Sequence, residues 1–254
     1  MSGVHLHIAD GLAELRLDNP AKLNCFTVDM LGQLASHLEV IEGRPEVSAV
    51  IVTGEGEKAF CSGADINAWG ELSPADFARN WVRGGHRLFD RLARLSKPTI
   101  AALNGHAFGG GLELAAACDI RVIAPGAMIA LPEAAVGIVP GWSGTQRLAR
   151  LLPEGMLKEM SLFGRRIGAD RLLATGFVAE IAAAPRAAAR EIASAATLSP
   201  RATEIAKAMI HAGAGEDTAA MIEALGSAAI AASLDREAGV AAFRGKRKPE
   251  FPGT

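Results

Sequence analysis

Apolar residues recur along the first two-thirds of the chain with the spacing of strands and helices in alternation. Alternating apolar positions over residues 4–17, on either side of Asp10-Gly11, predict a β-hairpin, because this dipeptide tolerates positive φ angles. Apolar positions at helical spacing predict a helix over residues 27–41, with Thr27 as its N-cap, and another helix from Ser73 onward. Short apolar runs predict strands over residues 49–53, 99–103 and 120–123. This alternation predicts an α/β fold with parallel strand pairing.

The last part of the chain has a different pattern. From about Pro185 it is Ala-rich, with helical periodicity and no convincing strand, and Asp217 is expected to cap a long helix that runs toward Phe243. We therefore divide the chain into a core, residues 1–190, and a helical C-terminal region, residues 191–254. Faces rich in Ala let helices approach closely, which suits a contact between subunits as well as an internal one.

Composition and charge exclude several classes of protein. Hydrophobic residues make up 50% of the 254 residues and charged residues 21%, which excludes wholesale disorder. The net charge of -2 gives no indication of a nucleic acid or an anionic membrane as partner. No apolar stretch reaches the roughly 20 residues of a membrane-spanning helix, and we expect no secretory signal over residues 1–10. The three cysteines are widely spaced and lack metal-ligand spacing, so we expect buried thiols in a cytoplasmic protein: Cys25, Cys61 and Cys118.

The most informative segment is a glycine-rich turn between a predicted strand and a predicted apolar helix. Gly109, Gly110 and Gly111 allow backbone N–H groups to approach a ligand without a Cβ in the way. A helix N-terminus adds partial positive charge and unpaired donors, which suits an anion or an oxygen that becomes anionic during a reaction. The dinucleotide-binding and P-loop patterns are not met. A tight turn that only packs closely is the alternative interpretation.

Two acidic residues interrupt apolar runs. Glu113 lies in the first turn of the apolar helix, and Glu133 follows Pro132 in a second apolar segment. Burial raises the pKa of a carboxyl group, and a raised pKa suits proton transfer near neutral pH. Paired carboxyls from different elements can flank one reacting group. Alternatively, Glu113 is placed for the helix dipole and the two acids are unrelated surface residues.

A third segment, residues 59–66, follows a predicted strand and contains Gly63, which again allows close backbone approach. One N–H group from this segment and one from the glycine-rich turn could meet at a carbonyl oxygen. The sequence alone leaves open whether they converge.

Together these segments resemble the crotonase family, also called the enoyl-CoA hydratase/isomerase family. The resemblance spans nearly the whole chain in order. The matching stretches are FCSGADI at residues 60–66, KPTIAALNGHAFGGGLE at 97–113, LPE at 131–133, GIVPG at 137–141, GTQRL at 144–148 and KRKPEF at 246–251.

The resemblance implies a spiral of repeated ββα units with an α-helical C-terminal region, assembled as trimers or dimers of trimers through residues 191–254. It implies an acyl thioester of coenzyme A as substrate, with no metal or redox cofactor. The backbone N–H groups of Ala64 and Gly110 fall where the family places its two oxyanion-hole donors. Glu113 and Glu133 fall where the hydratases carry their two catalytic acids, and having both favours hydration over isomerisation.

The resemblance also implies substrate contacts. Gly141 corresponds to a backbone contact for the reacting water, while Gly109, Gly111 and Trp142 would lie beside the substrate. Trp142 and Ser143 stand where hydratases commonly have smaller residues, so Trp142 either shapes the acyl pocket or belongs to the core. The residues expected to contact coenzyme A are Lys22, Ala64, Asp65 and Ile66, with a solvated Lys22 as the alternative.

The leading hypothesis is an enoyl-CoA hydratase that converts a 2-enoyl-CoA to a 3-hydroxyacyl-CoA in fatty-acid or related acyl-CoA degradation. The first alternative is an enoyl-CoA isomerase, or a dehydratase of another acyl-CoA, on the same fold. A non-catalytic acyl-CoA-binding or RNA-associated protein is the second alternative. The balanced charge and both retained acids speak against it.

Overall fold

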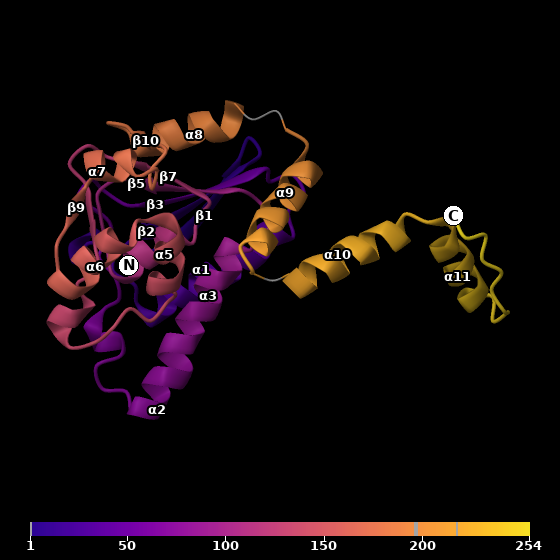
Figure 1. Cartoon of the computed structure of the whole chain (residues 1–254), viewed down its shortest axis with the longest axis horizontal. Coiled ribbons are helices and arrows are strands. Elements are labelled where there is room, and N and C mark those ends of the chain that lie inside the picture. Colours follow the sequence, from indigo (N-terminus) through magenta and orange to yellow (C-terminus); the bar gives the residue numbers. More distant parts are fainter. Residues whose placement is uncertain (1, 196–197, 217) are drawn as a thin grey trace. The chain divides into compact units, whose positions relative to one another are not determined.

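The computed structural model describes residues 2–195, 198–216 and 218–254 (Figure 1). The chain forms two compact units, one ending at Thr203 and the other running from Glu204 to Thr254. Both β-sheets belong to the first unit, and helix α9 (Pro200–Gly213) runs from the end of the first unit into the second. Within the described ranges, no helix is long and apolar enough to cross a membrane.

The larger sheet has six strands in the order β1-β2-β3-β5-β7-β10. Strands β1 and β2 form the predicted antiparallel hairpin, whose turn residues Asp10 and Gly11 both have positive φ angles. All the other neighbours in this sheet pair in parallel, as predicted. The strands are β1 (Gly3–Ala9), β2 (Leu12–Asp18), β3 (Ala49–Gly54), β5 (Thr99–Leu103), β7 (Ile120–Ile123) and β10 (Glu180–Ile181).

A second sheet of four short strands, in the order β4-β6-β8-β9, was not predicted. Strands β3 and β4, β5 and β6, and β7 and β8 form successive pairs along the chain, and each pair gives one strand to each sheet. Each of these pairs is followed by a helical segment, so the chain turns through ββα units. The strands are β4 (Ala59–Cys61), β6 (His106–Phe108), β8 (Met128–Ala130) and β9 (Ile167–Gly168).

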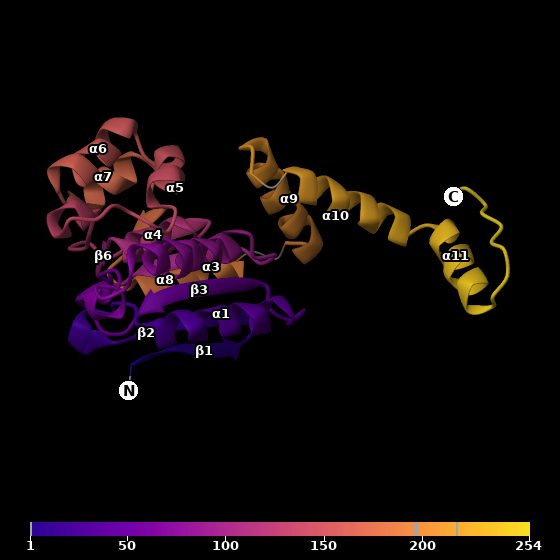
Figure 2. The same cartoon turned by 90° about the horizontal axis from the view of Figure 1, so that it is seen from below.

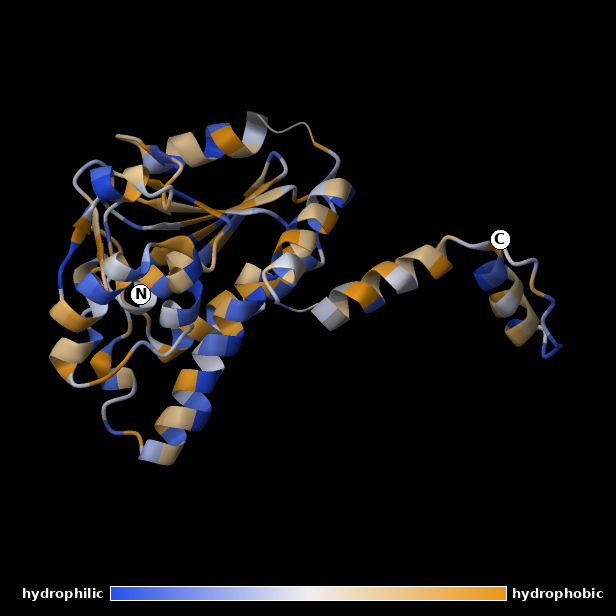
Figure 3. Ribbon diagram, viewed as in Figure 1, coloured by the Kyte–Doolittle hydropathy of each residue, from blue (hydrophilic) through white to orange (hydrophobic). Residues whose placement is uncertain are grey.

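Helices cover both faces of the larger sheet. Figure 2 shows α1 (Val28–Glu42) and α3 (Arg83–Ala93) in front of the sheet, with α8 (Pro185–Ala195) behind it. Alternate residues of β3 pack into the two apolar clusters, Val50 on the α1 side and Ile51 against Ala189 of α8. The strands accordingly appear largely apolar along their length (Figure 3).

Capping residues fix where two of the predicted helices begin. Thr27 Oγ1 accepts a hydrogen bond from the amide of Met30, and Ser73 caps α2, which continues through a π-helical segment, η3, into α3. The remaining elements of the first unit are η1 (Pro20–Lys22), η2 (Ile66–Ala68), α2 (Pro74–Asp76), η3 (Phe77–Val82), α4 (Gly110–Ala116), η4 (Glu133–Val136), α5 (Gly144–Leu151), α6 (Glu154–Phe163) and α7 (Ala169–Ala174).

The prediction of one long helix toward Phe243 is wrong. The segment contains α10 (Thr218–Ala231) and α11 (Leu234–Arg244), separated where Ser233 adopts an extended conformation. Ser233 Oγ accepts a hydrogen bond from the amide of Arg236, so this residue serves as the N-cap of a new helix. Asp217, the expected cap, lies outside the described residues.

Candidate active site

A cavity of about 240 Å³ opens in the first unit, beside the start of α4. One side is backbone from the loop after β4 and from the glycine-rich turn, and the other side is largely apolar. The lining residues include Ser62, Gly63, Ala64, Ile66, Trp69, Phe77, Trp81, Val82, Gly109, Gly110, Glu113, Pro132, Glu133, Val136, Ile138, Val139, Gly141 and Trp142. Most of the residues that the sequence singled out therefore meet at one place.

Glu113 lies in the first turn of α4 and is 3% exposed. Its Oε1 atom accepts hydrogen bonds from the amides of Trp142 and Gly144, both at 2.7 Å. Burial raises the pKa of Glu113 to about 7, although the two amides favour the ionised form and oppose this rise. Both amides bind Oε1, so neither of them donates to Oε2.

Glu133 opens η4, directly after Pro132, and is 8% exposed. Its Oε2 atom is buried and has no hydrogen-bond partner among the residues that the structure describes. Burial raises the pKa of this carboxyl group as well. A buried carboxyl oxygen without a donor favours the protonated form, so the environments of Glu113 and Glu133 differ.

The loops that carry Ala64 and Gly110 lie side by side. A Cβ built on Gly63 would be 3.5 Å from the Gly110 nitrogen, so the two backbones lie close together, and the φ angle of 108° at Gly63 is one that favours glycine. The Phe26 amide donates a hydrogen bond to the Gly63 carbonyl, and the Phe26 carbonyl accepts one from the Asp65 amide. The N–H group of Ala64 takes no part in these two bonds.

The Gly110 amide occupies the first position of α4, where a helix has no internal acceptor for it. Ala64 and Gly110 both line the cavity. Two N–H groups from distant parts of the sequence are thus available on neighbouring loops at one cavity.

Trp142 belongs to both the cavity wall and the core. It is 3% exposed, and its ring packs at 5.2 Å from the rings of Phe89 and Trp81. Its indole Nε1 donates to the Trp81 carbonyl at 3.2 Å. A Cβ on Gly85 would lie 2.2 Å from Nε1, so this glycine of α3 provides the space that the indole fills. Trp142 therefore lines the cavity and also packs in the core.

Of the residues predicted to contact coenzyme A, Ala64, Asp65 and Ile66 follow β4, whereas Lys22 ends η1. Ile66 lines the cavity and is 52% exposed, next to Ala64. Asp65 pairs with Lys22 at 2.6 Å, and neither of these two side chains lines the cavity. The charged pair lies immediately beside the residue that supplies one of the two amides.

The three predicted glycines beside the substrate differ in position. Gly109 and Gly141 line the cavity, and a Cβ on Gly109 would lie 3.0 Å from Glu133 Oε1. Gly111 does not line it: a Cβ there would lie 2.1 Å from the Cys61 carbonyl oxygen, so Gly111 permits close packing of α4 on β4.

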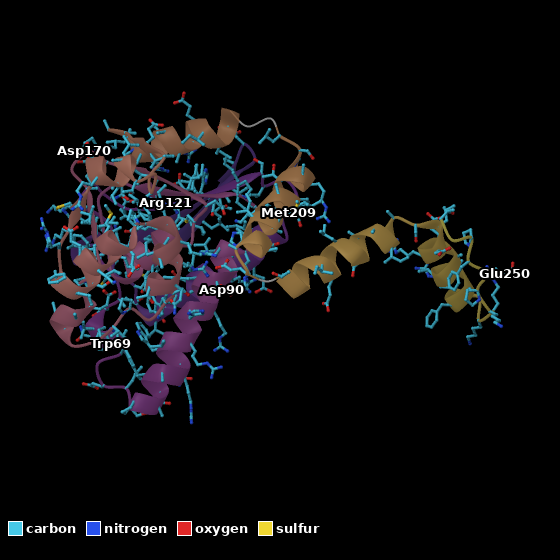
Figure 4. The ribbon with its side chains drawn as sticks, viewed as in Figure 1. Trp69, Asp90, Arg121, Asp170, Met209 and Glu250 are labelled. Carbon is cyan, nitrogen blue, oxygen red and sulfur yellow. The ribbon has the colours of Figure 1, made fainter. Side chains whose placement is uncertain are left out.

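Sequence reasoning missed several residues of the site. The aromatic wall formed by Trp69, Phe77 and Trp81 was unrecognised, because the apolar spacing from Ser73 onward predicted only a helix (Figure 4 labels Trp69). An apolar stripe does not distinguish a core face from a cavity wall. The amides of Trp142 and Gly144 carry no side-chain signal at all.

Fold and site together define a class: an α/β protein in which two buried carboxyl groups and two backbone amides meet at a largely apolar cavity. Comparisons with known proteins agree. The family model described as enoyl-CoA hydratase/isomerase matches residues 7–254. The chain belongs to the enoyl-CoA hydratase/isomerase family, and the resemblance noted in the sequence is confirmed.

Relatives match the chain along nearly its whole length. The short-chain-enoyl-CoA hydratase of Clostridium acetobutylicum is 36% identical over 255 residues, covering 98% of this chain and 97% of that protein. The crotonyl-CoA hydratase of Syntrophomonas wolfei is 35% identical over 246 residues, covering 94% of each. The crystal structure of an enoyl-CoA hydratase from Bacillus anthracis is 33% identical with a TM-score of 0.80, covering 99% of each chain. The predicted crotonase-like α/β fold is confirmed.

Proposed function

We propose that this protein is an enoyl-CoA hydratase, a hydro-lyase that adds water across the 2,3 double bond of an enoyl-CoA thioester to give a 3-hydroxyacyl-CoA. One observation carries the proposal: Glu113 and Glu133, both buried, line the same cavity as the backbone amides of Ala64 and Gly110. The hydratase names of the relatives from Clostridium acetobutylicum and Syntrophomonas wolfei support it.

The amides of Ala64 and Gly110 would bind the thioester oxygen. Attack of water at Cβ of the enoyl group moves negative charge onto this oxygen, which gives an enolate-like intermediate. Fixed N–H donors stabilise such charge without reorganisation, and loss of one donor typically costs about 10²–10³ in rate.

The two carboxyl groups have different partners and so suit different roles. Glu113, which receives two amide hydrogen bonds, would act in its ionised form and take the proton of the attacking water. Glu133, whose Oε2 lacks a donor among the described residues, would act in its protonated form and deliver a proton to Cα. The proton balance closes, because water gives one proton to Glu113 and Cα receives one from Glu133.

Further substrate contacts are part of the proposal. Lys22, Asp65 and Ile66 would contact coenzyme A, Gly141 the reacting water, and Trp142 the acyl group. Side-chain acids and backbone amides supply the groups that this reaction uses, so we propose no metal or redox cofactor.

We also propose a cytoplasmic homotrimer or dimer of trimers acting in fatty-acid or related acyl-CoA degradation, with residues 191–254 in the contacts between subunits. This rests on the family resemblance and on the Ala-rich helices of that region.

The test is hydration of crotonyl-CoA, followed by loss of the absorbance of the conjugated thioester, with product analysis. Glu113→Gln and Glu133→Gln should each lower kcat by about 10²–10⁴ while circular dichroism stays native, because each removes a proton-transfer group. Glu154→Gln, at an exposed carboxyl group, is the control. Wild-type rates in both site variants would contradict the proposal, and dependence on Glu133 alone with a 3-enoyl-CoA would indicate an isomerase.

A further inference from the structure

The turn at residues 142–144 supplies both amides that hold Glu113, and its central residue has an unusual conformation. Ser143 is buried and has a φ angle of 77°, in the left-handed region that favours glycine. The amides of Trp142 and Gly144, on either side of it, donate to Glu113 Oε1. The direction of both donors therefore depends on how firmly the backbone at Ser143 is held.

Helix α3 holds this turn from outside the cavity. Ser143 Oγ is hydrogen-bonded to His86 Nδ1 at 2.8 Å. One helical turn further along both helices, Arg147 of α5 pairs with Asp90 of α3 at 2.6 Å (Figure 4 labels Asp90). Among the described residues, neither Ser143 nor His86 lines the cavity, so neither is placed to touch a substrate.

We propose that Ser143 and His86 are positioning residues, which fix the turn so that the amides of Trp142 and Gly144 stay directed at Glu113. The inference rests on the proposed hydratase function, in which ionised Glu113 activates the water. A hydroxyl bound by an imidazole restricts a backbone conformation that glycine would adopt freely and also leave easily. The pair acts on the reaction only through Glu113.

Ser143→Gly separates positioning from stability, because glycine accepts a positive φ angle without strain. We expect its Tm to equal or exceed that of the wild type. Its kcat with crotonyl-CoA should fall about 10- to 100-fold at nearly constant KM, since the catalytic group is displaced while substrate contacts remain. His86→Leu should have the same effect on kcat. Ser143→Asn should restore most of the activity, because Asn tolerates this conformation and keeps a polar side chain.

The pH profile provides a readout that a purely structural role would not change. Both amide bonds favour ionised Glu113, so loosening them raises its pKa and moves the acidic limb of kcat/KM to higher pH. The other titratable and charged groups near Glu113 and this turn are Glu133 from η4, which interacts electrostatically with Glu113, His86 from α3, and the paired Arg147 and Asp90. Glu133 and the Arg147–Asp90 pair are unchanged in Ser143→Gly, so the shift would report the donors to Glu113.

Asp10→Gly is the matched control. Asp10 also has a positive φ angle, 52°, but lies in the β1–β2 turn outside the cavity, so its replacement should leave kcat and the pH profile unchanged. Wild-type kcat and pH profile in both Ser143→Gly and His86→Leu would overturn the inference, as would a loss of activity matched by a loss of Tm in Ser143→Gly. A wild-type chain that hydrates no enoyl-CoA would overturn the proposed function instead, and the inference with it.

Discussion

Glu113 and Glu133 are the same type of residue at the same cavity, and their hydrogen bonds distinguish them. Two amides compensate the charge of Glu113 on Oε1, whereas Glu133 Oε2 has no such donor among the described residues. Burial is the main cause of the raised pKa of Glu113, and the nearby carboxyl group of Glu133 adds to the rise. Burial raises the pKa of both carboxyl groups, and the proposed reaction uses the Glu113 charge that the two amides stabilise, together with a protonated Glu133.

The raised pKa of Glu113 has a consequence for stability. Its value of about 7 in the folded protein exceeds the ordinary 4.5, so the ionised form destabilises the fold increasingly as pH rises between these values. Glu113→Gln removes this charge. It should raise the free energy of unfolding by about 3 kcal/mol near pH 8 and by much less near pH 5.

Urea denaturation at the two pH values measures this difference. Glu154→Gln, at an exposed carboxyl group whose pKa is lowered by a hydrogen bond to Lys158, should show no gain that grows with pH. An equal gain for Glu113→Gln at both pH values would contradict the raised pKa.

At the scale of elements, the site depends on how α3 meets the segment that follows η4. The indole of Trp142 fills the space left by Gly85, and its N–H binds the carbonyl of Trp81 in the π-helical segment. Neighbouring Gly84 has open space around it. Gly85 therefore leaves room for the indole, whereas no neighbouring group requires a glycine at position 84.

This difference predicts opposite effects of the same substitution. Gly85→Ala should lower the free energy of unfolding by about 1–3 kcal/mol, because its Cβ would overlap the indole of Trp142. Gly84→Ala should raise it by up to about 1 kcal/mol, since alanine is the better helix former. Chemical denaturation followed by circular dichroism measures both. Destabilisation by Gly84→Ala, or none by Gly85→Ala, would contradict this packing.

Elements with strong local signals were predictable from the sequence. Helix α1 has apolar residues at helical spacing and a capping residue, Thr27, at its start. Strand β7 is a short and mostly apolar run. The second sheet was missed because strands such as β4 and β6 contain three residues each, too few to show a period. The break at Ser233 was missed because helical periodicity continues across it, and only the extended backbone at this residue ends the helix.

At the scale of the whole molecule, the two buried acids and the glycine-rich turn were predictable because acids in apolar runs and glycines before a helix are visible in the sequence. Their convergence was not predictable from local patterns, since it depends on the ββα winding that brings the loop after β4 beside the start of α4. The family resemblance supplied that step. The hydrogen bond between Ser143 and His86 joins residues far apart in sequence, which no local pattern indicates.

The unit from Glu204 to Thr254 carries large apolar side chains that are exposed in the single chain, among them Ile222 (67%) and Phe243 (86%). Exposed apolar side chains gathered on one unit are typical of contacts between subunits. If the proposed trimer forms through this unit, Ile222→Glu should shift the mass measured by light scattering toward that of the 26.3 kDa monomer, because it would bury a charge at the contact.

Val28→Glu is the control for this experiment, since it places the same charge at an exposed β-branched residue of the first unit, at the start of α1 where a helix favours an acid. Its mass should equal that of the wild type. Retained assembly in Ile222→Glu, or a monomeric wild type, would contradict a contact through the unit from Glu204 to Thr254. Loss of assembly together with native circular dichroism would assign the contact to the C-terminal helices.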